Sequence, residues 1–254
     1  MKKAIQSSLW VGVVVVFAGT WAAAQTSVTL TGPPPGYSYD GIYVSPYYAT
    51  VGGVTNVPVV CDDFGDNSTL STWNATVTPF TSISPTNTSW SLAGKSLTQY
   101  DAVAWLTLQV LQQTPGTTGQ IIYSFADWAL FDPSGVASYL TKNPVSTGTL
   151  TSAALCNDIF GSGAYSAGVC NAAGGGLIAA AYAAGVPAGI GNMVIISPDS
   201  GTSICKAETG CVAQEFIAFV PEGGAALAYL VLAGLCCFGA IFLRSRRQTT
   251  VPAA

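Results

Sequence analysis

The sequence predicts an α+β domain, in which a β-sandwich-like sheet carries an inserted helical segment, followed by one C-terminal transmembrane helix. Three observations lead to this fold class. Alternation of apolar and polar residues typical of strands occupies residues 27–80 and returns at 192–198 and 214–220. Helical spacing of apolar residues fills the middle of the chain, and residues 223–243 contain no charged side chain. Because strands lie at both ends of the domain, we expect distant segments to close one sheet.

Local start and stop signals predict three helices in the middle of the chain. Ser96 and Gln99 form a capping box, and helical spacing continues from there until Pro115. A second helix is expected over residues 118–131 and a third, shorter one near 134–140. The helices therefore interrupt the strands as a single inserted block.

Residues 1–24 are predicted to form a secretory signal peptide. Lys2 and Lys3 provide a basic start, an apolar run covers residues 9–21, and three alanines at 22–24 match a small-residue cleavage site. An uncleaved membrane anchor is the alternative interpretation. Cleavage would leave an exported domain over residues 25–218.

Export permits disulfides, which makes the seven cysteines informative. Two of them lie inside the C-terminal apolar segment. Pairing of Cys156 with Cys170 and of Cys205 with Cys211 is the simplest connectivity, although four cysteines allow three pairings. Cys61 is then left over.

The C-terminal segment 223–243 is predicted to cross a membrane once. Its 21 residues would form a helix of about 31 Å, which matches a hydrocarbon core of about 30 Å. Arg244, Arg246 and Arg247 follow directly, and such clusters remain on the cytoplasmic side. Residues 248–254 would then form a short cytoplasmic tail.

The order of parts in residues 219–247 resembles the PEP-CTERM sorting signal. That family combines a Pro-Glu-Pro-like motif, a transmembrane helix and a basic tail. The matching parts here are Val220, Pro221 and Glu222, then the span, then the three arginines, with Gly223 where a second proline is usual. The resemblance implies an exosortase-type sorting protease as partner, in a Gram-negative bacterium that exports extracellular polysaccharide.

The exported domain is also similar to a group of PEP-CTERM ectodomains with a Cys-Asp-Asp-Phe segment. Three stretches carry the similarity, over about 100 residues. They are Tyr43, Pro46 and Tyr47, then Cys61 to Phe64, then Ser124, Ala126 and Trp128. The resemblance implies a surface protein of undescribed activity.

A cysteine on a strand, together with a helical residue four positions before a tryptophan, is similar to the thioester domains of bacterial adhesins. There a cysteine thiol condenses with a glutamine carboxamide. Here Cys61 and Trp128 match, but Ser124 occupies the glutamine position and cannot supply the acyl carbon. Gln120 lies one turn earlier. The site is therefore expected to be degenerate, and Cys61 as a small buried hydrophobe is the alternative.

Two further groups suggest ligands. Asp62, Asp63 and Asp66 form an oxygen-rich cluster that is a weak candidate for Ca²⁺, with a solvated turn as the alternative. Exposed tyrosines could stack on sugar rings, although tyrosines on strands usually pack. These tyrosines are Tyr37, Tyr39, Tyr43, Tyr47 and Tyr48.

Composition excludes several function classes. Residues 25–222 contain three lysines and all twelve carboxylates of the chain, which gives this region a net charge of −9. Such an acidic surface is not suited to binding nucleic acid. The chain contains no histidine, so neither a Ser-His-Asp nor a Cys-His arrangement can exist. Asp101 and Asp127 are the carboxylate pair considered for glycoside chemistry.

We therefore expect a structural or interaction protein rather than an enzyme. It would be exported, held in the inner membrane by a single span during sorting, and then placed on the cell surface or outside the cell. The first alternative is a carbohydrate-binding module or thioester-like adhesin, with exopolysaccharide as partner, and the second is an extracellular enzyme. We expect no cofactor other than the weak Ca²⁺ candidate.

Overall fold

The computed structural model describes the exported domain but neither end of the chain. The predicted span 223–243 and most of the signal peptide therefore lie outside the described residues. No helix in the described part is long and apolar enough to cross a membrane. The described residues are 24–32, 38–39, 41–62, 64, 72–83, 95–142, 146–147, 150–166, 169–170, 175–199 and 214–219.

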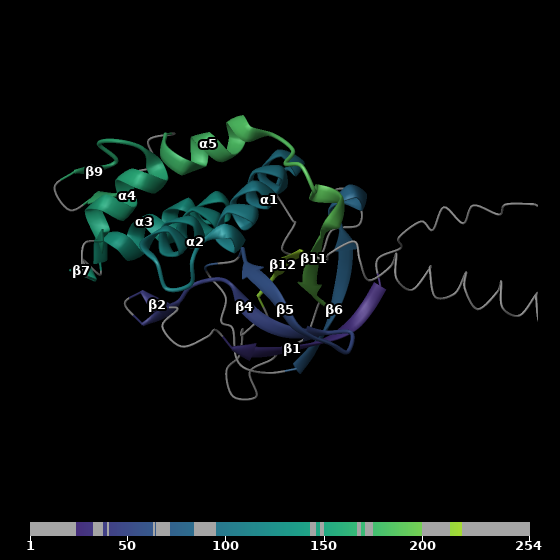
Figure 1. Ribbon diagram of the computed structural model, residues 1–254. Helices are drawn as coiled ribbons and strands as arrows, with labels where there is room; N and C mark the ends of the chain where they lie inside the picture. Colours follow the sequence, from purple (N-terminus) through teal and green to yellow (C-terminus); the bar gives the residue numbers. More distant parts are fainter. Residues whose placement is uncertain are drawn as a thin grey trace, which may run out of the picture.

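Six antiparallel strands close into a β-barrel (Figure 1). Around the barrel they follow the order β1 (Ala24–Gly32), β4 (Tyr47–Val51), β5 (Val54–Cys61), β12 (Phe216–Phe219), β11 (Met193–Pro198) and β6 (Thr72–Pro79). The α+β class is thus confirmed, but the sheet is a closed barrel rather than sandwich-like. The sheet closes because β1 pairs with β4 along one edge and with β6 along the other, so neither edge of β1 is free.

The two predicted late strands are present as β11 and β12, and they complete the barrel. β12 is inserted between β5 and β11, pairing Phe216 with Cys61 and Ile217 with Ile195. Its side chains alternate between two cores, since Phe216 and Ala218 lie in the barrel interior whereas Ile217 faces the helices. One short strand therefore links both halves of the domain.

Five helices in the described part of the chain form the inserted block and lie together beside the barrel (Figure 1). They are α1 (Leu97–Gln112), α2 (Thr118–Phe131), α3 (Pro133–Lys142), α4 (Ser152–Phe160) and α5 (Gly176–Ala184). The predicted capping box is present, because the Ser96 side chain accepts from the Gln99 amide and the Gln99 side chain accepts from the Ser96 amide. The predicted bounds of the second helix agree with α2.

The remaining elements are short. Three two-stranded hairpins pair β2 (Ser38–Tyr39) with β3 (Ile42–Tyr43), β7 (Ser146–Thr147) with β8 (Leu150–Thr151), and β9 (Tyr165–Ser166) with β10 (Val169–Cys170). Two 3₁₀ turns, Phe80–Ser82 and Ile190–Asn192, connect β6 and β11 to the helical block.

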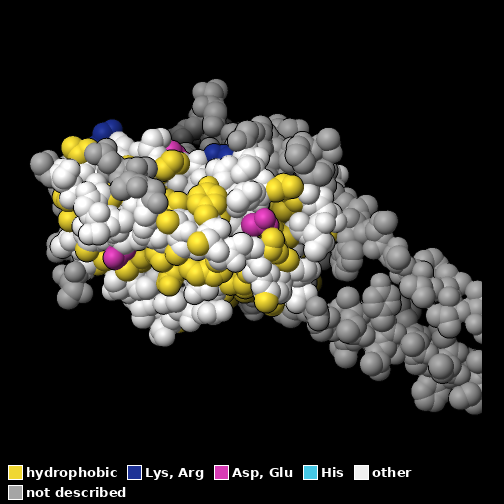
Figure 2. Space-filling view, turned by 90° about the horizontal axis from the view of Figure 1, so that it is seen from above, with side chains coloured by type: hydrophobic (Ala, Val, Ile, Leu, Met, Phe, Trp, Pro, Cys, Tyr) yellow, Lys and Arg dark blue, Asp and Glu magenta, His cyan; other side chains and the backbone are white. Residues whose placement is uncertain are grey.

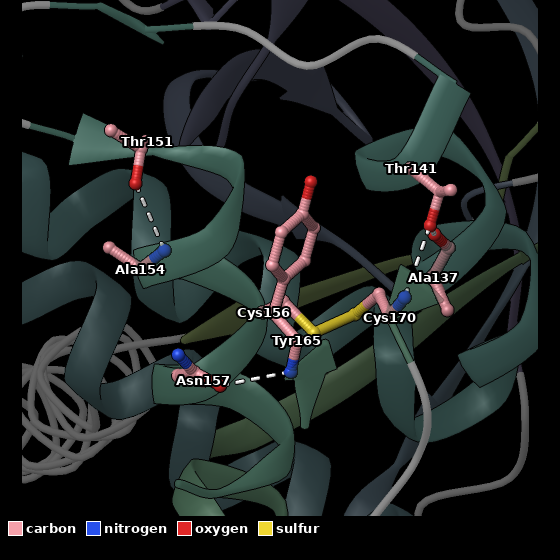
Figure 3. The surroundings of a disulfide bond; sticks show 8 residues. All are labelled: Ala137, Thr141, Thr151, Ala154, Cys156, Asn157, Tyr165 and Cys170. Carbon is pink, nitrogen blue, oxygen red and sulfur yellow. Dashed lines mark hydrogen bonds between the residues drawn. A yellow bond between two sulfur atoms is a disulfide. The ribbon is translucent and has the colours of Figure 1, made fainter. Parts of the chain in front are cut away.

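A disulfide fastens the far side of the helical block (Figure 3). Cys156 of α4 is bonded to Cys170 of β10, as the local pairing predicted. Thr141 of α3 accepts a hydrogen bond from the Cys170 amide at 3.2 Å, so a third element joins the junction. Asn157 accepts from the Tyr165 amide at 3.0 Å and holds the same hairpin on α4. The predicted partners Cys205 and Cys211 lie outside the described residues.

Candidate functional site

The three sequence stretches that carry the ectodomain resemblance meet at one buried place. Its centre is Ser45, which is fully buried and is followed by a cis peptide bond to Pro46. The Cys61 amide, at the end of β5, donates to the Ser45 hydroxyl oxygen at 3.0 Å. Helix α2 approaches Ser45 with two side chains, Gln120 and Ser124. We call this set of four residues, Ser45, Cys61, Gln120 and Ser124, the Ser45 junction.

Both α2 side chains bond the same acceptor. The Gln120 amide nitrogen donates to the Ser45 carbonyl oxygen, and the Ser124 hydroxyl donates to that oxygen at 3.4 Å. The other end of the Gln120 carboxamide accepts from the Gly116 amide at 2.6 Å. Gln120 and Ser124 are buried, with 1% and 0% of their surface exposed. The buried carboxamide is therefore held at both ends by hydrogen bonds to the backbone.

Cys61 is a buried thiol that takes no part in the disulfide. Its side chain belongs to the core inside the barrel, beside Phe216 and Val59. The prediction of a buried cysteine on a strand is thus confirmed. The structure brings the Cys61 amide and the Ser124 hydroxyl to the same residue, Ser45, and adds the carboxamide of Gln120, which lies one helical turn before Ser124.

Trp128 packs in an aromatic cluster next to the Ser45 junction. Its ring lies 4.9 Å from Phe125 and 5.3 Å from Phe64, measured between ring centroids. Phe64 closes the Cys-Asp-Asp-Phe segment, so this contact joins two of the three matched stretches. Tyr39 and Tyr139 complete the cluster. Trp128 thus fixes α2 against the segment that carries Cys61.

A second polar group lies where β11 and β12 face α1. Glu215 is 1% exposed, and its carboxylate accepts from the hydroxyls of Tyr100, at 2.8 Å, and Ser197. The Glu215 carbonyl oxygen accepts from the Asp62 amide at 3.5 Å. Asp62 is itself buried, so this first member of the Ca²⁺ candidate does not lie in a solvated turn.

The calcium hypothesis remains a prediction. Asp63 and Asp66 lie outside the described residues. Among the residues that are described, no group of three or more Asp, Glu or Cys side chains is placed to hold a metal ion.

The carboxylates considered for glycoside chemistry occupy different environments. Asp127 is fully buried, and its carboxyl accepts from the Thr107 hydroxyl at 3.4 Å across the α1–α2 contact. Burial raises the pKa of Asp127 well above its ordinary value of 3.8, against the opposing effect of Thr107. Burial also raises the pKa of Asp101, which is only partly buried. Asp127 therefore lies in helix packing and lines none of the described cavities.

The tyrosine hypothesis is wrong for two of its members. Tyr39 and Tyr47 are 0% and 4% exposed, because they pack against Phe125 and Phe216 respectively. Tyr43 is 56% exposed and could still contact a sugar ring. Tyr37 lies outside the described residues.

A cavity of about 740 Å³ opens between the barrel and the end of α1. Gln120 lines it, so the Ser45 junction forms part of its wall. Charged side chains are few on the face of the molecule in Figure 2, consistent with a chain that is 8% charged. No known protein family, curated protein or solved structure matches this chain.

Proposed function

We propose that the protein is an exported bacterial surface or matrix protein of interaction type, sorted through its C-terminal segment. The observation that carries the proposal is where the barrel ends. β12 finishes at Phe219, and Val220, Pro221 and Glu222 follow at once. A cut at this motif would therefore leave every barrel strand in the mature chain.

The start of the barrel supports the same conclusion. A cut before Gln25 would remove only the first residue of β1, Ala24. Gln25 is tied to the barrel by a hydrogen bond from its side-chain amide to the Asp199 carboxylate at 2.6 Å. The Cys156–Cys170 disulfide also supports export, because disulfides form and persist in oxidising compartments outside the cytoplasm.

The mass of the mature C-terminus tests the sorting proposal. Expression beside an exosortase-type protease should yield a chain that ends near Glu222. The Pro221→Ala/Glu222→Ala variant should keep the segment, and Gly223→Pro, which restores the usual second proline, should be cut at least as well as the wild type. A wild-type chain that retains Arg247 would show that the segment is an anchor only.

The Ser45 junction favours a second candidate function, a thioester adhesin that uses Gln120 instead of Ser124. The Cys61 sulfur would bond the Gln120 carboxamide carbon while the C–N bond breaks, and ammonia would leave with the thiol proton. An amine on a surface partner would later attack that carbon, forming an amide and regenerating the thiol. The Cys61 amide and the Gln120 carboxamide both bond Ser45, whereas the Cys61 side chain lies in the core inside the barrel, so the first step requires the thiol to turn toward Gln120.

Mass spectrometry of the intact protein decides this candidate. Condensation removes ammonia, so the wild type should weigh about 17 Da less than its sequence predicts. Cys61→Ala and Gln120→Ala should each restore the full mass, whereas Ser124→Ala, the matched control, should keep the loss. A wild-type protein at full mass would rule out the thioester and leave the sorting proposal untouched.

A further inference from the structure

We infer that the cavity beside the Ser45 junction, here called the barrel-mouth pocket, holds the hydrocarbon chain of a membrane lipid while the protein is attached to the membrane. Its volume of about 740 Å³ lies within the range of roughly 300–1,000 Å³ found for small-molecule sites. Its walls come from the β4–β5 hairpin, from β6, β11 and β12, and from the end of α1.

The lining indicates an uncharged, apolar ligand. Val57, Val77, Val110, Leu111 and Val194 are among the described residues that form the walls, and none of the lining residues carries a charge. The buried amide in the wall, Gln120, already bonds the Ser45 carbonyl and the Gly116 amide. A charged or strongly polar ligand would therefore lose its hydration without gaining a charged partner.

The rim of the pocket exposes apolar surface to solvent. Val54 is 64% exposed at the tip of the β4–β5 hairpin, directly after the turn at Gly52 and Gly53. Both glycines have positive φ, as a tight hairpin turn requires, so the tip is a built feature of the strand pair. Val51 and Val57 beside it are only partly buried. This rim would be covered if it met a bilayer.

The chain connections place the pocket near the proposed membrane segment. Phe219 lines the pocket and is the last residue of β12. The apolar run begins at residue 223, and four residue steps extend to at most about 14 Å. Val77, another lining residue, pairs with Ala24, where the signal peptide is predicted to end. Both ends of the exported domain therefore leave the barrel beside this pocket.

These observations favour a lipid hydrocarbon chain as the occupant of the barrel-mouth pocket. A lipid chain is uncharged, matches the apolar walls and is available where the domain joins the bilayer. This inference rests on the proposed membrane attachment, since the lipid reaches the pocket only when residues 223–243 anchor the chain.

Photo-cross-linking of the full chain in vesicles tests the inference. The probe is a phosphatidylcholine with a photoactivatable diazirine in its acyl chain. Irradiation should label peptides that contain residues 54–58 and 110–111. Val54→Asp places a carboxylate at the rim and Val57→Trp fills the pocket, and each should reduce labelling of these peptides about tenfold or more.

The matched control is Val169→Asp, which changes an exposed valine, 48% exposed, on the β9–β10 hairpin beside α3. This variant should be labelled like the wild type. Because Val54 is exposed, the Val54→Asp variant should have the same melting temperature as the wild type. This measurement separates a loss of lipid binding from misfolding. Labelling confined to residues 223–243, or equal in all variants, would overturn the inference.

Sedimentation of the same vesicles separates this inference from the proposed function. A chain that does not sediment with the vesicles would refute the membrane attachment, and the lipid inference would fall with it. A chain that sediments but shows no label in the pocket refutes the lipid inference alone.

Discussion

Replacing Cys156 and Cys170 by alanine should destabilise the domain by about 3 kcal/mol or more. The two cysteines are 14 residues apart, and a cross-link that closes a loop of this length raises the free energy of unfolding by about 3 kcal/mol, because it restricts the unfolded chain. Both side chains are buried, so lost packing adds to the cost. For a domain of this size, the midpoint of thermal unfolding should fall by about 6–12 °C.

Thermal and urea unfolding of the full chain in detergent would measure this effect. Reduction of the wild type removes the cross-link but keeps the sulfur atoms, so the difference between the wild type and the double variant, both under reducing conditions, isolates the packing part. If the double variant unfolds within about 0.5 kcal/mol of the oxidised wild type, the reasoning from loop length is refuted.

Three further substitutions test the buried polar groups and the backbone. Asp127→Asn should stabilise the protein at neutral pH. Burial raises the carboxyl pKa of Asp127 above 3.8 in the folded state, so the wild type holds its full stability below that pH and loses it as the pH rises through the folded pKa. In urea unfolding, the difference in the free energy of unfolding between variant and wild type should thus widen from about pH 4 to pH 7. A constant difference would contradict the raised pKa of Asp127. Tyr100→Phe removes a buried hydroxyl that bonds a carboxylate and should cost about 1.5–3 kcal/mol, whereas Tyr43→Phe, at an exposed ring, should change stability by less than about 0.5 kcal/mol. Equal effects of these two variants would show that the buried bond contributes nothing. Gly176→Ala should cost several kcal/mol, because φ is +61° and the added Cβ would lie 2.5 Å from a backbone oxygen of α4; Gly163→Ala, with φ of +82° and open space, should cost only about 1–2 kcal/mol. Melting temperatures that fall equally in both glycine variants would count against the clash.

Three of the five described helices, α1 to α3, were predictable because their signals are local. The capping box at Ser96 acts within four residues, and the second helix, 118–131, begins after Pro115-Gly116 and ends before Asp132-Pro133. The disulfide between Cys156 and Cys170 was also a local prediction. In each case the residues that decide the element are near neighbours in the chain.

The candidate site depended on contacts that no local pattern contains. Gln120 and Ser45 are 75 residues apart, and Ser124 and Ser45 are 79 apart. Motif matching identified Ser124 because it looked for a fixed distance from Trp128. The spacing of four between Gln120 and Ser124, which places both on one face of a helix, was the available signal.

The sequence by itself determined the α+β class, the start of α1, the bounds of α2, the late strands and the local disulfide, because periodicity, caps and short loops encode them. Only the tertiary structure decided that the sheet closes into a barrel, since closure depends on one strand, β1, finding partners on both of its edges. It also decided that Cys61, Ser124 and Gln120 converge on Ser45, and that an uncharged pocket lies where the domain meets its C-terminal segment. Those features arise from long-range packing, in which residues far apart in sequence are brought together by the burial of two cores.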